Sequence, residues 1–445
     1  MAAPIQEPRA LGVLMCTGLV IGNTIGIGIF VMPAALAPYG LNALIGWLVT
    51  TVGCLFVAWV FAGLARALPQ DDGPYAYTRR AFGGGVAFAI MWCYWVSVWV
   101  TNAAIAIGVA GYVSAFLPVI NHDRLLAALT ALALLWAFVA INLRGVRTAG
   151  WVQVLGTALK LVPQAAIVAL GMWQLARNPG AYVAHLPATP LGLKPVIAAS
   201  TIALFAMIGV ECASVPAGKV RDPARTIPRA TVIGAALVAL IYISISVVPM
   251  LLIPQQQLAA SSAPFADLFA RILGTGFGKL LAAFVIVSGL GALNGWTLMV
   301  GEVTQSCATN GGLPASLGQT NRHGAPQSAF LLTGAVASVM LLLNYGGSTA
   351  SVFTFLSVVV TAATLPLYFG CALAVLVLWR RGQIARPGAR ELSWLAAAAL
   401  ALVYCVWTFI GVGTQSLLWA LALGAAGGPV YWWSQRRQRP AQVAL

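Results

Sequence analysis

Two apolar stretches interrupted by glycine decide the fold: Gly22-Asn23-Thr24-Ile25-Gly26-Ile27-Gly28-Ile29-Phe30 and Phe205-Ala206-Met207-Ile208-Gly209-Val210-Glu211. Each lies in a run long enough to cross a bilayer, which takes about 20 residues. Glycine holds a helix poorly, so we expect both helices to open in mid-membrane and expose backbone groups. A membrane tolerates such groups only where they line a protein cavity, and a matched pair of interrupted helices is typical of a transporter's substrate site.

The composition is that of an integral membrane protein. Of the 445 residues, 60% are hydrophobic and 7% are charged, and the mean hydropathy is +0.91, far outside the soluble range. The loops are too short for a second folded domain, so we expect one transmembrane domain over 1–445. About twelve apolar runs predict membrane spans, at 11–37, 40–67, 85–116, 125–143, 149–173, 195–218, 227–252, 277–308, 328–344, 349–379, 391–411 and 415–433.

The net charge of +15 reports orientation in the membrane. With a cytoplasmic N-terminus, 18 of the 24 Lys and Arg residues fall in inside segments, 5 in outside loops, and Lys160 within a span. This distribution follows the positive-inside rule and predicts an inner (plasma) membrane protein with both termini cytoplasmic, facing anionic lipid. Because no basic soluble module is present, we expect no nucleic-acid partner.

Cysteine and histidine give no catalytic or metal-binding pattern. The seven cysteines all fall in apolar segments, and the three histidines, His122, His185 and His323, all fall in predicted loops. We therefore expect no disulfide framework, no metal site and no cofactor. We read the histidines as solvated loop residues.

The predicted spans fall into an internal repeat. Spans one to five (11–173) and six to ten (195–379) each begin with a glycine-broken helix. An odd number of spans per half inverts the second half relative to the first, which predicts an all-α 5+5 inverted repeat. The last two spans (391–433) lie outside it and are candidates for packing or for a homodimer contact.

Several motifs, spread over nearly the whole length, carry a family resemblance. They are the first-span run from Gly22 to Pro33, the loop Gly73-Pro74-Tyr75-Ala76-Tyr77 with Arg79-Arg80, Ile208-Gly209-Val210-Glu211 with Arg221-Asp222-Pro223 and Ile227-Pro228, Gly295-Trp296-Thr297, and Leu402-Val403-Tyr404-Cys405-Val406-Trp407. With these motifs the chain resembles the amino acid/polyamine/organocation (APC) superfamily. Within it, the chain is most similar to the bacterial basic amino acid and polyamine antiporters of the arginine/agmatine type.

The broken first span predicts a site for an α-amino acid. The half-helix that begins near Gly28 offers N–H groups to a carboxylate, while carbonyls around Ile21 to Asn23 and near Ala206 suit an α-ammonium. We therefore expect substrate contacts at Asn23, Ile25, Gly26, Ile27, Gly28, Phe205 and Ile208. The alternative for Gly22 and Gly26 is close helix packing of the small-xxx-small kind.

Two charged residues are candidates for proton coupling. Glu211 and Glu302 are the acidic residues placed well inside apolar spans, and Glu211 sits two residues past a break. An intramembrane carboxylate is costly, so we predict that Glu211 is a proton site or gate, the alternative being a structural hydrogen-bond partner. In the resembled antiporters the matching glutamate is the pH-linked residue. Lys160 departs from them and matches a fifth-span lysine of proton-coupled relatives, where it can carry a proton or tether the first span.

Aromatic residues give the remaining prediction about the substrate. By resemblance, Trp296 encloses the aliphatic part of the substrate, while Phe205 replaces a stacking tryptophan and Ile27 replaces a serine. A phenyl face still attracts a guanidinium or ammonium, by about 0.5–2 kcal/mol. Three residues of the third span, Tyr94, Trp95 and Asn102, complete the expected wall and gate, although Asn102 equally suits packing.

These features favour a secondary transporter over an enzyme or a channel. The sequence shows no cluster of His, Cys or carboxylates for catalysis, and an inverted repeat builds one occluded site, not a pore. The resemblance implies exchange of a cationic amino acid (arginine, lysine or ornithine) for its decarboxylated amine, such as agmatine or another polyamine. Proton-coupled uptake of a neutral or cationic amino acid is the alternative, with protons as the coupling ion.

Overall fold

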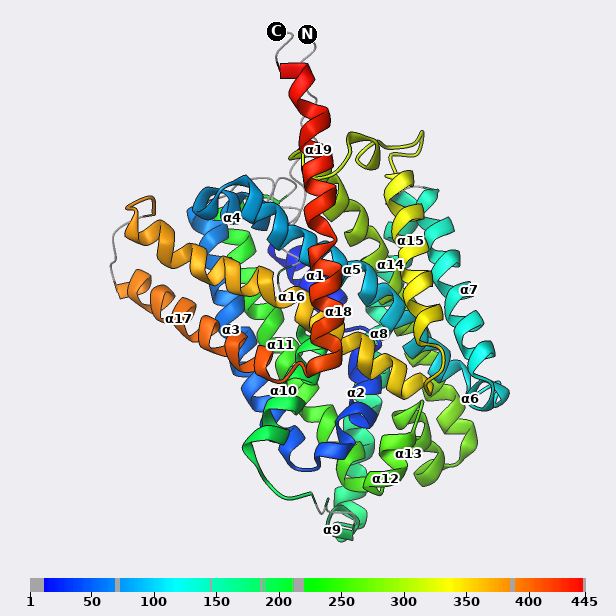
Figure 1. Ribbon diagram of the computed structural model, residues 1–445. Helices are drawn as coiled ribbons and strands as arrows, with labels where there is room; N and C mark the ends of the chain where they lie inside the picture. Colours follow the sequence, from blue (N-terminus) through cyan, green and yellow to red (C-terminus); the bar gives the residue numbers. More distant parts are fainter. Residues whose placement is uncertain are drawn as a thin grey trace.

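The computed structural model describes residues 12–68, 73–144, 146–184, 187, 189–209, 211, 220–384 and 389–442. Within them the secondary-structure elements are helices joined by loops and turns (Figure 1). The helices are α1 (Val13–Thr24), α2 (Gly28–Leu36), α3 (Asn42–Ala67), α4 (Pro74–Phe82), α5 (Gly84–Val113), α6 (Val119–His122), α7 (Arg124–Leu143), α8 (Val146–Arg177), α9 (Ala181–Ala184), α10 (Leu193–Met207), α11 (Pro223–Leu252), α12 (Gln255–Ala260), α13 (Pro264–Leu273), α14 (Thr275–Thr309), α15 (Gln327–Asn344), α16 (Thr349–Arg380), α17 (Ala389–Ile410), α18 (Thr414–Ala425) and α19 (Gly427–Gln442), with 3-10 turns η1 (Ala37–Tyr39) and η3 (Ala315–Leu317).

The predicted all-α membrane fold is confirmed. Eight helices in the described part of the chain are long and apolar enough to cross a membrane: α3, α5, α7, α11, α14, α15, α16 and α17. The first predicted span is divided between α1 and α2, the fifth corresponds to α8, and the sixth begins as α10. The first predicted span is therefore interrupted, and the helix that begins the sixth stops at Met207, ahead of Gly209.

The helices form a buried centre with peripheral helices around it. In the most apolar 18-residue segment of each helix, 94% of the segment is buried in α5 and 83% in α16, whereas 39% is buried in each of α7, α15 and α17. α5 packs against both α14 and α16. Of the short helices, α2 contacts α5, α10, α11 and α16, and α10 contacts α3, α16 and α17. In Figure 1, α4 and α19 lie at one end of the molecule, here termed the α19 end, and α9, α12 and α13 lie at the opposite end.

Two sequence expectations are wrong in detail. The expected loop at Gly73–Tyr77 is the start of helix α4: Gly73 adopts a φ of 44° and Pro74 occupies the first turn, a position that proline favours. The expected span at 415–433 is two helices separated at Ala426. There Trp92 of α5 donates to the carbonyl of Leu423 over 2.8 Å, and Pro429 lacks the N–H that a continuous helix needs.

Candidate functional site

The first helix is open between Ile25 and Ile27, as the glycine spacing predicts. The last turn of α1 is closed by the N–H of Ile25, which donates to the carbonyl of Ile21 over 2.8 Å, and α2 begins at Gly28. In the described structure, the N–H groups of Gly26, Ile27 and Gly28 donate to no backbone carbonyl. The opening therefore presents a row of backbone donors at the start of α2.

Both glycines of the opening permit close packing. A Cβ on Gly26 would lie 3.0 Å from the Cβ of Ala292 in α14. A Cβ on Gly28 would lie 3.1 Å from the ring of Phe205 in α10. The packing alternative is thus met at Gly26, while Gly28 brings the start of α2 directly under an aromatic ring.

Two buried tyrosines stabilise the carbonyls beside this opening. Tyr242 of α11 donates its hydroxyl to the carbonyl of Thr24 over 2.7 Å. Tyr112 of α5 donates to the carbonyl of Phe30, also over 2.7 Å. Backbone carbonyls left without donors in a buried site cost free energy, so these tyrosines hold the interrupted helix in its open form. The sequence analysis did not identify them, because a tyrosine within an apolar helix carries no distinguishing pattern.

The second broken helix ends where the sequence predicts. α10 stops at Met207, Ile208 is extended, and Gly209 adopts a φ of 120°, a conformation that favours glycine. The N–H of Gly209 then donates to Oε2 of Glu211 over 3.1 Å. The residues that would form the other half of this span, 212–219, lie outside the described structure.

Glu211 is the centre of a polar cluster with no solvent exposure. Its Oε1 accepts from the hydroxyl of Tyr94 over 2.9 Å, and its Oε2 accepts from the hydroxyl of Tyr368 over 2.7 Å. The structure thus joins the two predicted gating residues, Tyr94 and Glu211, and adds Tyr368 of α16, which the sequence analysis missed. Three helices, α5, α10 and α16, meet at this carboxylate.

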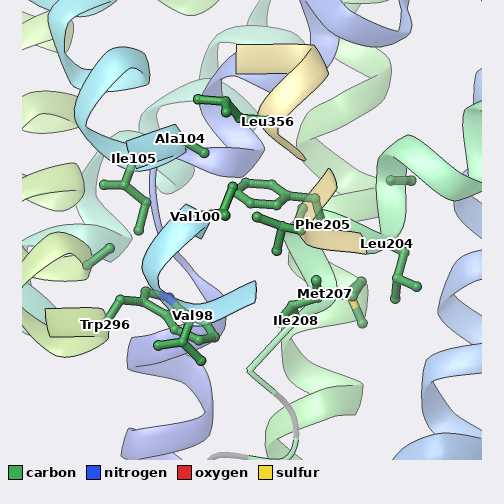
Figure 2. Close-up of a cluster of buried hydrophobic side chains, with 14 of the residues drawn as sticks. Val98, Val100, Ala104, Ile105, Leu204, Phe205, Met207, Ile208, Trp296 and Leu356 are labelled. Carbon is green, nitrogen blue, oxygen red and sulfur yellow. The ribbon is translucent and has the colours of Figure 1, made fainter. Parts of the chain in front are cut away.

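Beside the two openings lies an apolar wall. Phe205, Ile208 and Trp296 are nearly fully buried. Figure 2 shows them in one cluster of buried side chains with Val98 and Val100 of α5. The ring of Phe205 meets that of Phe353 of α16 edge-on, with centroids 5.4 Å apart. Phe205 of α10 and Trp296 of α14 therefore belong to one buried cluster.

Ile25 and Ile27 of the opening are both fully buried. The side chain of Ile27 packs against Gly108 of α5 and Gly289 of α14. A Cβ on Gly108 would lie 3.1 Å from an Ile27 side-chain atom, and a Cβ on Gly289 would lie 3.3 Å from one. Its side chain therefore fills a space between two helices.

The third-span residues differ in their surroundings. Trp95 donates its indole N–H to Thr304 of α14 over 2.9 Å and lies 4.9 Å from the ring of Trp92, which is a packing arrangement. Asn102 is buried, and its Oδ1 accepts no hydrogen bond from a described residue. Asn142 of α7, which the sequence analysis did not consider, donates to Asn294 of α14 over 3.1 Å, two residues from Trp296.

Two predicted side chains cannot be placed beside these residues. Asn23 lies in α1 and Lys160 in α8, but their side chains fall outside the described part of the structure. Within the described residues, no three His, Cys, Asp or Glu side chains gather in an arrangement that could hold a metal ion. What the described arrangement offers chemically is free backbone donors, aromatic faces and one buried carboxylate, which are groups that can bind an amino acid or amine.

The sequence model that describes the amino acid permease family matches residues 11–427. The chain belongs to the amino acid permease family. This places it in the APC superfamily, as the motifs indicated, and makes it a multi-pass membrane transporter.

Three relatives within this permease family are informative. The cadaverine/lysine antiporter of Escherichia coli strain K12 is 30% identical over 423 residues, covering 93% of this chain and 92% of the relative. The arginine/ornithine antiporter of Pseudomonas aeruginosa is 30% identical over 447 residues, covering 97% and 92%. The arginine/agmatine antiporter of Chlamydia abortus is 29% identical over 455 residues, covering 98% and 92%. Each of the three aligns with this permease over nearly the full length of both chains.

Proposed function

We propose that this permease exchanges a cationic amino acid for its decarboxylated amine by alternating access. The observation that carries the proposal is the meeting of the open start of α2, the aromatic pair Phe205 and Trp296, and the buried Glu211 cluster. The exchange activities for which the three relatives are named, each of cationic amino acids or amines, support it.

The amino acid end of the substrate binds at the openings. The free N–H groups of Gly26, Ile27 and Gly28 at the start of α2 receive its carboxylate, aided by the positive end of the helix dipole. Carbonyls at the ends of α1 and α10, together with Asn23, receive its α-ammonium. Ile25 contributes through its backbone beside them. An amine without a carboxylate leaves the α2 donors unused, which distinguishes the two exchanged substrates.

The cationic side chain of the substrate binds over aromatic faces. Phe205, Ile208 and Trp296 lie in one buried cluster beside the two openings (Figure 2). Attraction of a guanidinium or ammonium to such rings is worth about 0.5–2 kcal/mol. Asn102, with its unmatched Oδ1, is the polar wall residue that a substrate N–H can reach.

Coupling and gating are assigned to the Glu211 cluster. A carboxylate that accepts from Tyr94 and Tyr368 ties α10 to α5 and α16, so a change in its protonation alters the contact between three helices. Lys160 favours the second candidate function, proton-coupled uptake of a neutral or cationic amino acid, because a lysine within a span can itself carry the proton.

The proposal includes a topology. The α19 end faces the cytoplasm, as the distribution of Lys and Arg favours, and the chain forms one transporter domain in the inner membrane. The spans from 391 onward, α17 to α19, provide a face for a homodimer.

Competition for labelled arginine, measured on the purified full-length permease, tests the substrate class. We expect unlabelled lysine, ornithine, agmatine and cadaverine to displace arginine, and leucine and alanine to fail. Displacement by leucine or alanine in preference to every cationic compound contradicts the proposal and favours the uptake function.

A further inference from the structure

A recess outside the transport site lies between α3, α11 and α17. It has a volume of about 330 Å³, within the range of about 300–1,000 Å³ that is typical of small-molecule sites. Its walls come from nine residues of three helices: Trp59, Ala62, Gly63, Arg66, Pro228, Arg229, Val232, Ile233 and Trp394. None of these residues takes part in the transport site described above.

The recess follows from the spacing of residues on α3. Trp59, Ala62, Gly63 and Arg66 recur every three to four positions and so form one stripe along the helix. Arg66 lies in its last turn, at the α19 end. Trp59 precedes it by seven residues, about 10 Å along the axis at 1.5 Å per residue. The stripe therefore runs from the membrane surface into the hydrocarbon.

Gly63 makes room for the wall that α17 supplies. A Cβ on Gly63 would lie 2.2 Å from Nε1 of Trp394, so the indole rests on the backbone of α3. Trp394 is buried, whereas Trp59 of α3 and Ile233 of α11 are 47% and 46% exposed. The recess consequently has a firm inner wall and an apolar rim that opens toward lipid.

Two arginines lie at the mouth of this recess without acidic partners. Arg66 and Arg229 are both exposed, and neither forms an ion pair with a described residue. The ion pair found nearby joins Arg225 to Asp222 and leaves Arg229 free. Two guanidinium groups above apolar walls match a phosphate group joined to an acyl chain.

We propose that this recess binds one anionic glycerophospholipid. The phosphate lies between Arg66 and Arg229, and an acyl chain descends along Trp59 and Ile233. The exposed apolar walls assign the site to a lipid and not to free phosphate, because inorganic phosphate would leave Trp59 and Ile233 without a contact. The lipid bridges α3, α11 and α17. Of these, α11 is the helix that carries Tyr242.

Lipid titration of the purified permease, followed by native mass spectrometry, tests the site. The probes are phosphatidylglycerol, phosphatidylcholine and inorganic phosphate. The test variant is the double substitution Arg66→Gln with Arg229→Gln. The control is Arg144→Gln with Arg380→Gln, which removes two exposed arginines at the same end but outside the recess. A further variant, Arg66→Lys with Arg229→Lys, keeps both charges.

We expect the parent protein and the control to retain one phosphatidylglycerol more tightly than phosphatidylcholine. The test variant loses this binding by about 30-fold, since each surface arginine contributes about fivefold, and the lysine variant recovers part of it. Equal retention of phosphatidylglycerol by the test variant and the control overturns the proposal. Binding of inorganic phosphate as tight as that of the lipid also overturns it, because the recess would then be a phosphate site only.

Discussion

Tyr368 of α16 donates its hydroxyl to Oε2 of Glu211 over 2.7 Å, at a carboxylate that is fully buried beside the end of α10. The same oxygen accepts the N–H of Gly209, where α10 has already ended. One hydrogen-bonded group therefore links the break in the sixth span to a long helix of the buried centre. In the proposed mechanism, a change in the protonation of Glu211 acts on this contact.

Glu211→Gln should flatten the pH dependence of transport while leaving part of substrate binding intact. The amide has nearly the shape of the carboxyl group but does not titrate, so the coupling is lost and the cavity is kept. Transport of labelled arginine, measured in proteoliposomes between pH 5 and 8, gives the profile. Glu302→Gln, the other carboxylate within an apolar span, is the control and should keep the parent profile.

Lys160→Ala separates the two proton candidates. If Glu211 is the pH-linked group, this variant transports more slowly but still responds to pH, because only the contact between the fifth and first spans is weakened. Loss of the pH response in Lys160→Ala, with retention in Glu211→Gln, assigns the proton to the lysine. The chain is then better described as a proton-coupled uptake permease.

Tyr368→Phe should move the midpoint of the pH profile of transport. The substitution removes a hydrogen bond to the charged form of Glu211, and such bonds contribute about 1.5–3 kcal/mol. The same transport assay measures the shift. Tyr345→Phe, at an exposed tyrosine beyond the end of α15, should leave the midpoint in place. An unchanged midpoint in Tyr368→Phe would show that this hydrogen bond does not set the pH response.

The sequence predicted the openings well and the groups that stabilise them poorly. Glycine spacing identified Gly26, Gly28 and Gly209, because the loss of helix propensity is local and visible in the chain. The donors that make the openings stable, Tyr112, Tyr242 and Tyr368, come from α5, α11 and α16. A tyrosine's partner depends on how distant helices pack, which no local pattern encodes. The break of α18 from α19 was missed for the same reason, since Trp92 supplies its hydrogen bond from α5.

Tyr242→Phe should destabilise the permease by about 1–3 kcal/mol, because the buried carbonyl of Thr24 loses its hydroxyl donor. Thermal unfolding of the purified protein in detergent measures the change as a lower melting temperature. We expect saturating arginine to recover part of the loss, since a ligand that binds the folded state stabilises it. A variant that melts with the parent protein would indicate that the carbonyl finds another donor.

Trp296→Ala should weaken substrate binding by about 1–3 kcal/mol through loss of the aromatic contact. Equilibrium binding of labelled arginine measures the loss. Trp136→Ala, at a partly exposed tryptophan of α7 that bonds to Ser338, controls for the general effect of removing an indole. Equal affinities of the two variants would remove Trp296 from the proposed site.

Counterflow in proteoliposomes tests the central claim most directly. Vesicles containing the purified permease are loaded with one unlabelled compound, and uptake of labelled arginine is followed at equal internal and external pH. We predict that internal agmatine, cadaverine, lysine or ornithine drives uptake, and that empty vesicles or vesicles loaded with leucine take up almost none. The opposite result would contradict exchange: an imposed proton gradient drives uptake into empty vesicles, and no internal cation stimulates it.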